Sequence, residues 1–138
     1  MALTDLQTFP EEFQDHWELP LVGDTISRCM VDAAFHIQFL DRKDPVTVTV
    51  ESPFTLTKGG VSKRLSPEEP IELGPALELF KGIVVTALAY KTGHLRIELS
   101  GGLMLTVPPD DEYEAWSIVS DHNLKMVCTP GGTVALWT

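Results

Sequence analysis

The stretch "VTVTVE" at residues 46–51 constrains the fold of this chain more than any other feature. Valine and threonine alternate through it, and both are β-branched residues that suit a pleated strand better than a helix. Successive side chains of a strand point to opposite faces, so the valines share one face and the threonines share the other. The pattern predicts a half-buried strand whose valine face lies on a hydrophobic core.

Comparable runs recur along the chain, and clusters of Gly, Pro, Asp and Asn separate them, as turns separate strands. We expect strands at 25–32, 35–40, 46–51, 52–57, 83–90, 94–100, 103–107, 113–120, 125–129 and 133–137. The run "IVVTALAY" is almost wholly apolar, which indicates a central strand. The turns "DHN" and "PGG" between the last three runs predict a meander.

Two stretches of the chain follow the same plan, which suggests a duplicated three-strand unit. "GDTISRCMVDAAFHIQF" and "GIVVTALAYKTGHLRI" each run from a glycine through an apolar strand into an alternating strand, and another alternating run follows each of them. Common β patterning explains such a match as well as duplication does. We therefore expect a mainly β, single-domain fold over residues 1–138, an antiparallel sandwich or a small barrel, with one short helix near residues 75–80.

Two segments depart from strand patterning. In the lead-in, residues 1–17, Phe9, Phe13 and Trp17 recur at four-residue spacing, which predicts a short amphipathic helix or turn that packs on the core. Residues 58–75 hold Gly, Pro and mixed charges without periodicity, so we expect a long loop there.

The formal net charge of −10 bears on possible partners. Such a chain repels nucleic acid and anionic membranes, and a cationic partner would be steered toward it at low salt. No run approaches the roughly 20 apolar residues of a membrane span, and the first residues lack the features of a signal peptide, so we expect a cytoplasmic protein. Cys29 and Cys128 lie far apart in strand-like runs, and we expect buried thiols.

Residues able to catalyse reactions or bind metals have no recognised spacing. None of the four histidines lies three or four residues from another histidine or from a cysteine, as zinc ligands do. A G-x-S-x-G motif and a phosphate-binding loop are both missing from the sequence. We therefore expect no catalytic residue, no metal site and no cofactor, and we expect His94 to stabilise a turn or face solvent.

The segment "PDDEYEAW" is the best candidate for a charged site. Paired carboxylates can hold a hard cation or contact a basic partner, although the spacing is not that of a calcium loop. Acidic residues before a strand also commonly protect its edge from association, and this interpretation is favoured. If the segment binds a partner, the residues involved are Asp110, Asp111, Glu112, Glu114 and Trp116. Tyr113 and Trp116 would face opposite sides, so that one of them packs in the core.

The stretches "LPLVG", "VDAAFHIQF" and "ESPFTL", with the ending "YEAW…VCTPGGTVALW", resemble an uncharacterised family of small, mainly actinobacterial domains. The resemblance covers about Leu19 to Trp137. It implies a small, mainly β bacterial domain, and it implies no activity and no catalytic residue.

Three hypotheses about function follow from these observations. The first is a non-enzymatic bacterial protein-binding module, such as an immunity-type protein that neutralises a basic protein partner. The second is a small-ligand carrier or sensor with an aromatic-ringed β-barrel mouth. The third is an enzyme that uses dispersed residues such as Asp110, Glu112 and His94, which would have to converge in one pocket.

Overall fold

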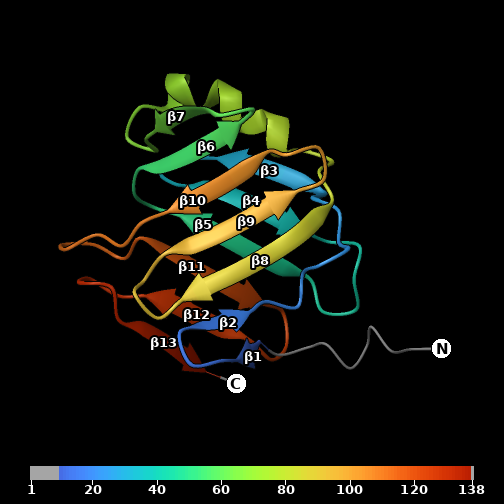
Figure 1. Cartoon of the computed structure of the whole chain (residues 1–138), viewed down its shortest axis with the longest axis vertical. Coiled ribbons are helices and arrows are strands. Elements are labelled where there is room, and N and C mark those ends of the chain that lie inside the picture. The colour runs from blue at the N-terminus through green and yellow to red at the C-terminus, as the bar shows by residue number, and fades with distance from the viewer. Residues whose placement is uncertain (1–9, 138) are drawn as a thin grey trace.

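Two antiparallel β-sheets lie face to face and form a sandwich (Figure 1). The computed structural model describes residues 10–137. The expected mainly β sandwich is therefore confirmed, and the described strands do not close into a barrel.

The strands of each sheet are antiparallel to their neighbours. The seven-stranded sheet has the order β1 (Glu11–Glu12), β2 (His16–Glu18), β8 (Val84–Tyr90), β9 (Leu95–Leu99), β10 (Met104–Val107), β6 (Phe54–Lys58) and β7 (Val61–Leu65). The six-stranded sheet has the order β13 (Val134–Trp137), β12 (Lys125–Cys128), β11 (Trp116–Ser120), β5 (Val46–Val50), β4 (Phe35–Phe39) and β3 (Arg28–Val31). A 3-10 helix, η2 (Pro70–Leu79), contacts β7 and β3.

The two sequence stretches that follow one plan form equivalent units. β3–β4–β5 is a meander in the six-stranded sheet, and β8–β9–β10 is a meander in the seven-stranded sheet. After each meander the chain crosses to the opposite sheet, where β6 pairs with β10 and β11 pairs with β5. The seven-stranded sheet therefore combines the β8–β9–β10 meander with the β1–β2 and β6–β7 hairpins of the first half of the chain. The six-stranded sheet combines the β3–β4–β5 meander with a second meander, β11–β12–β13, from the second half.

Strand alternation places the core between the sheets, as the valine–threonine run predicts. In β5 the valines are buried and the threonines are half-buried. Facing strands repeat the pattern, and Phe35 of one sheet stacks on Phe54 of the other at a ring-centroid distance of 5.6 Å. These buried side chains form one continuous hydrophobic cluster.

The prediction of a long loop at residues 58–75 is wrong. Gly59 and Gly60 turn the chain with φ of 58° and 78°, and β7 follows directly. β7 lies at the edge of its sheet, and four of its five residues are exposed, so it shows no alternation of polar and apolar residues. η2 then begins at Pro70, earlier than the helix expected at 75–80. Its buried residues, Leu73, Ala76 and Leu79, follow the period of three that a 3-10 helix requires.

The lead-in also differs from its prediction where the structure describes it. β1 and β2 form a hairpin where a short amphipathic helix or turn was expected, and β2 pairs with β8. Trp17 packs in the core, whereas Phe13 is exposed and stacks on His16. Phe9 lies outside the described residues.

Candidate functional site

The acidic loop, residues 108–115, is the crossover that carries the chain from β10 to β11. The equivalent crossover, between β5 and β6, needs only residues 51–53. Asp111, Glu112, Tyr113 and Glu114 are all exposed on the longer loop. β11, which follows the loop, lies between β12 and β5, so the interpretation of these acids as protection of a strand edge is wrong.

Asp110 differs from the other carboxylates of the loop because it organises the turn. Its Oδ1 accepts hydrogen bonds from the backbone N–H of Glu112 at 2.8 Å and of Tyr113 at 3.0 Å. Its carbonyl oxygen accepts another from the N–H of Gly131 at 2.8 Å. These bonds fix the backbone that carries Tyr113, because an aspartate side chain can replace the backbone in a turn.

Trp116 holds the loop to the body of the protein. The side chain is fully buried, and its Nε1 donates a hydrogen bond of 2.9 Å to the carbonyl oxygen of Gly93. Tyr113 is 64% exposed. The expectation that one of these two aromatic residues packs in the core is confirmed, and the other, Tyr113, faces solvent. Trp116, predicted as a partner contact, has no exposed surface, so Tyr113 is the accessible aromatic side chain of this segment.

Glycines allow the neighbouring turns to pack closely on the acidic loop. Gly93 and Gly132 have φ of 99° and 100°. A Cβ on Gly93 would lie 2.7 Å from the carbonyl oxygen of Gly132 and 2.9 Å from Cβ of Pro109. The β8–β9 turn, the acidic loop and the β12–β13 turn therefore form one tightly packed corner.

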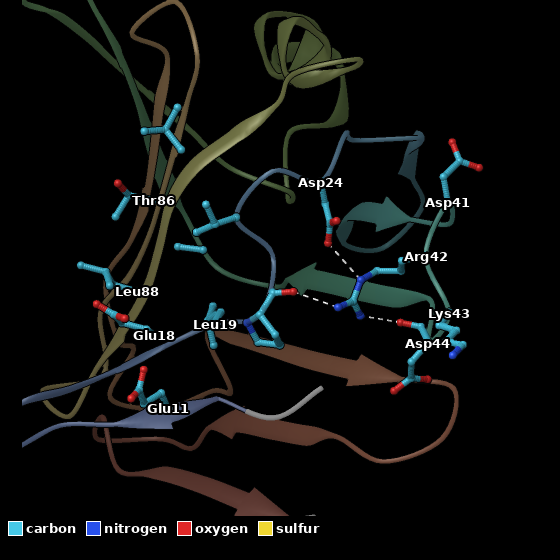
Figure 2. A pocket seen from close by; sticks show the side chains of 14 residues that line it. Glu11, Glu18, Leu19, Asp24, Asp41, Arg42, Lys43, Asp44, Thr86 and Leu88 are labelled. Carbon is cyan, nitrogen blue, oxygen red and sulfur yellow. Dashed lines mark hydrogen bonds and ion pairs between the residues drawn. The ribbon is translucent and has the colours of Figure 1, made fainter. Parts of the chain in front are cut away.

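A second feature is a cavity of about 660 Å³ between β8 and the turn that joins β4 to β5 (Figure 2). Leu19, Pro20, Val22 and Leu88 contribute apolar surface to its wall. The charged residues of the lining are Glu11, Glu18, Asp24, Asp41, Arg42, Lys43 and Asp44. Carboxylates thus outnumber cationic groups, so the cavity carries a negative charge.

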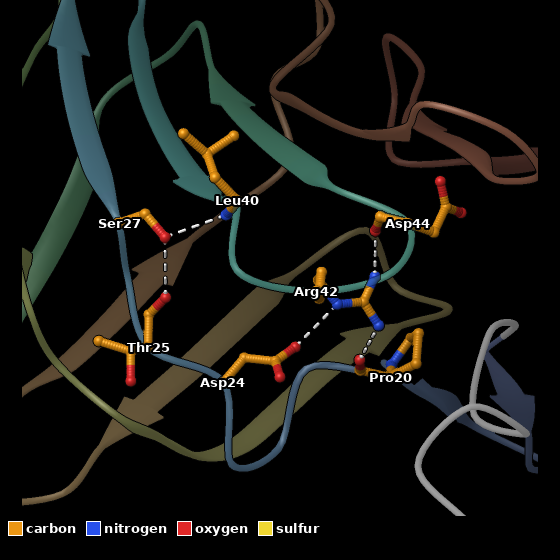
Figure 3. A network of polar contacts seen from close by, with 7 residues as sticks. All are labelled: Pro20, Asp24, Thr25, Ser27, Leu40, Arg42 and Asp44. Atoms are coloured by element: carbon orange, nitrogen blue, oxygen red, sulfur yellow. Dashed lines mark hydrogen bonds and ion pairs between the residues drawn. The ribbon is translucent and has the colours of Figure 1, made fainter. Parts of the chain in front are cut away.

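Arg42 joins the β4–β5 turn to the segment before β3 (Figure 3). Its guanidinium donates from Nε to Asp24 at 2.9 Å, from Nη1 to the carbonyl oxygen of Asp44 at 2.5 Å and from Nη2 to that of Pro20 at 2.8 Å. The side chain of Arg42 is only 13% exposed. Burial raises the pKa of Asp24, although the charge of Arg42 opposes that shift.

Asp44 supports the same turn from its other side. The residue is 6% exposed, and its Oδ1 accepts a hydrogen bond from the backbone N–H of His122 at 2.9 Å. The sequence pattern marks residues 41–45 only as a turn between two strands, and it gives no role to Asp44 or Arg42. In the sequence, Arg42 lies in the polar turn "DRKDP", and this turn has the same composition as a solvent-exposed turn without such contacts.

The titratable residues singled out from the sequence are dispersed. Asp110, Glu112 and His94, the residues of the enzyme hypothesis, do not line the cavity beside Arg42. His94 is exposed and lies 3.0 Å from the hydroxyl of Thr92, within its own turn. Between residues 10 and 137, no three His, Cys, Asp or Glu side chains cluster in a way that could hold a metal ion.

The cysteines are separate thiols. Cys128 is buried, as expected, and its Sγ lies 3.3 Å from the carbonyl oxygen of Gly93. Cys29 is only half-buried, yet burial raises the pKa of its thiol to about 11. A thiol with so high a pKa is almost wholly protonated at neutral pH and is a poor nucleophile.

Comparison with known proteins places the chain beside proteins without an assigned role. A family model described as "Family of unknown function (DUF6188)" matches residues 17–138. This match confirms the resemblance to an uncharacterised family that the sequence motifs indicated. Neither the curated proteins nor the solved structures contain a match to the chain. Within the described part of the chain, no helix has the length and apolar character needed to cross a membrane.

Proposed function

The chain belongs to DUF6188, a family of unknown function, and we propose that this member is a non-enzymatic protein-binding module for a basic partner protein. The observation that carries the proposal is Tyr113, which is 64% exposed among the carboxylates of the acidic loop. Tyrosine is enriched at binding hot spots, because it offers a large contact area with few rotatable bonds. Carboxylates around such an anchor attract a cationic surface and accelerate its encounter.

The packed corner supports the same proposal. A loop that is already held in place loses little conformational freedom on binding, so more of the contact energy contributes to affinity. Asp110 fixes the turn through its hydrogen bonds, and Trp116 anchors the loop to Gly93. Tyr113 and the exposed carboxylates are therefore presented by a rigid support.

A more specific form of the proposal is an immunity-type protein that neutralises a basic toxin. The net charge of −10 favours it, because long-range attraction speeds association with a cationic protein. Such binding weakens as salt rises, since screening becomes stronger.

The test is a pull-down from native bacterial lysate with two variants of matched charge. One variant neutralises the acidic loop through Asp111→Asn, Glu112→Gln and Glu114→Gln. The control removes the same number of charges from exposed acids near η2 through Glu68→Gln, Glu69→Gln and Glu72→Gln. We expect the wild type and the control to retain one stoichiometric basic protein at about 0.05 M salt and less of it at about 0.5 M.

The loop variant should lose this partner, and so should Tyr113→Ala. Equal losses in both charge variants would show that only the total charge matters. Recovery of no stoichiometric partner at either salt concentration would refute the proposal.

The cavity beside Arg42 supports a second candidate function, the binding of a small organic cation. Its volume of about 660 Å³ falls within the range of small-molecule sites. Glu11 and Glu18 lie directly opposite each other in the β1–β2 pair, where two like charges are unfavourable unless a cation lies near. The arrangement differs from the barrel mouth first expected, because the cavity lies between a strand and a turn.

A thermal-shift screen of linear amines and guanidines tests this candidate against matched organic anions. A ligand that binds only the folded state raises the melting temperature, and we expect this effect from cations alone. Glu18→Gln should abolish the shift, while Glu112→Gln on the acidic loop should leave it unchanged. Absence of a shift from every amine would exclude the candidate.

A further inference from the structure

The edges of the two sheets differ in how well they are protected from pairing with another chain. β1 carries Glu11 and Glu12, β7 carries Lys63 and Arg64, and β3 carries Arg28 and contacts η2. Charged side chains and covering elements are the usual means by which proteins block such edges. β13, at the end of the six-stranded sheet (Figure 1), has the sequence "VALW" with no charge and no proline.

The backbone of β13 has hydrogen-bonding groups available for a further strand. Thr129 donates its N–H to the carbonyl oxygen of Thr133, which sets the phase of the β12–β13 ladder. Hydrogen-bonded pairs alternate along an antiparallel ladder, so Ala135 and Trp137 bond to β12. The N–H and C=O groups of Val134 and Leu136 therefore point away from the sheet.

The side chains of β13 leave apolar surface at the same edge. Val134 and Leu136 pack against the core but stay half-buried. Trp137 is 53% exposed, and Nζ of Lys125 lies 5.4 Å from its ring centroid. A neighbouring strand would cover Leu136 on the inner face and Trp137 on the outer face.

The outer face beside this edge has no acidic side chain on its strands. Two cross-strand rows form it: Arg28, Gln38, Thr47, Val119, Lys125 and Trp137 in one, and Met30, His36, Thr49, Ser117, Val127 and Ala135 in the other. In a chain of net charge −10, two copies can approach each other with least repulsion where the nearby charges are positive or absent.

We propose that β13 pairs with β13 of a second copy, antiparallel around a two-fold axis at Leu136, and joins two six-stranded sheets into one. This register is self-complementary. It places Leu136 opposite Leu136 of the second copy as a hydrogen-bonded pair, and it places the large Trp137 opposite the small Ala135. The two Lys125 side chains then lie in different rows and do not face each other.

Sedimentation of the intact chain over a wide range of protein concentration tests the association. The weight-average mass should rise toward about twice the 15.2 kDa of one chain. The association should strengthen between about 0.05 M and about 0.5 M salt, because screening reduces the repulsion between two acidic chains. Added salt should weaken the binding of a basic partner at the acidic loop, whereas it should strengthen the association of two copies. The two proposals can therefore fail independently.

Single cysteines test the register. Leu136→Cys should form an intermolecular disulfide under mild oxidation, because Cα atoms of a hydrogen-bonded pair lie about 5.5 Å apart, within disulfide reach. Val134→Cys is the matched control, because the two copies of this residue would be more than about 13 Å apart along the strands. Cys29 and Cys128 should not interfere, because neither is an exposed thiol.

Leu136→Lys places a charge at the centre of the contact and should leave the chain monomeric, whereas Val119→Lys, on the outer face and two strands away from β13, should still dimerise. Circular dichroism verifies that both variants are folded. A wild-type chain that stays monomeric at every concentration and both salt levels overturns the proposal. Cross-linking of Val134→Cys as fast as that of Leu136→Cys overturns the register, and an edge that binds only extended peptides overturns the choice of a second copy.

Discussion

The indole Nε1 of Trp116 donates a hydrogen bond of 2.9 Å to the carbonyl oxygen of Gly93, which lies 23 residues earlier in the chain. Sγ of Cys128 lies 3.3 Å from the same oxygen. One carbonyl of the β8–β9 turn thus contacts strands β11 and β12 of the opposite sheet. Through Trp116, this contact holds the carboxyl end of the acidic loop in place.

Trp116→Phe removes this donor while keeping an aromatic ring. We expect a loss of about 1–3 kcal/mol in the free energy of unfolding, because a buried carbonyl loses its best partner. Urea unfolding measures the loss. Trp137→Phe, at a 53% exposed position, should change stability by less than about 0.5 kcal/mol. Equal effects of the two substitutions would contradict the anchoring role of Trp116.

Gly93→Ala tests the close packing of the corner. Gly93 has φ of 99°, and the added Cβ would collide with Gly132 and Pro109. Gly131→Ala is the matched control, because Gly131 has φ of 89° and a Cβ there would meet nothing within 4 Å. Gly131→Ala should lower the free energy of unfolding by about 1 kcal/mol, because of backbone strain alone. Gly93→Ala should lower it by about 3 kcal/mol or more. If thermal unfolding showed similar losses of stability for Gly93→Ala and Gly131→Ala, the turns could move apart at little cost in free energy.

Arg42→Met tests the partly buried ion pair beside the cavity. We expect a loss of about 2–3 kcal/mol at neutral pH, because Asp24 keeps a charge without its partner. Lys58→Met, in an exposed pair with Glu78 at 4.0 Å, should change stability by less than about 1 kcal/mol. Denaturant titrations of the two variants give the comparison.

The cost of Arg42→Met should depend on pH. The pKa of Asp24 is already raised above its ordinary 3.8, and loss of Arg42 should raise it further. A carboxyl whose pKa is raised by folding contributes stability below its unfolded pKa, and it loses that contribution as pH rises through the folded pKa. The penalty should therefore be smallest near pH 4 and grow toward neutral pH. A penalty that grows on acidification would contradict the burial of this charge.

Alkylation of Cys29 should be slow at pH 8. Its pKa of about 11 lies two units above the ordinary 9.0, so the reactive thiolate is about 100-fold scarcer than in an unfolded chain. The rate should rise about tenfold per pH unit up to pH 10. Peptide mapping after iodoacetamide treatment follows Cys29 separately from Cys128. A fast, pH-independent reaction would show that the thiolate is stabilised.

The strand pattern of this chain could be predicted because burial follows alternation. The valines of β5 and Val84, Ala87 and Ala89 of β8 face one continuous core, and the two similar meanders could be recognised from the order of such runs. β7 could not be recognised in this way, because an edge strand with exposed residues has no core to impose a pattern. The first half of η2 was assigned to the loop, because buried residues that repeat every three positions do not give the pattern of an α-helix.

The acidic loop illustrates the same limit for the candidate site. Its charges were evident from the sequence, but the exposure of Tyr113 and the burial of Trp116 depend on a contact with Gly93 in another turn. Arg42 could not be predicted, because its partners Asp24 and Pro20 come from a segment about twenty residues earlier that the fold brings beside it.

The exchange of strands between the two halves of the chain has a consequence for its synthesis. β5 pairs with β11, and β6 pairs with β10, so each sheet contains a strand pair whose members lie far apart in the sequence. β5 cannot complete its pairing before β11 has been synthesised. While the ribosome is still making residues 116–120, the nascent amino-terminal half exposes the open side of β5 to its surroundings. Neither half has a complete sheet of its own, and two fragments divided between η2 and β8 would each need the other in order to fold.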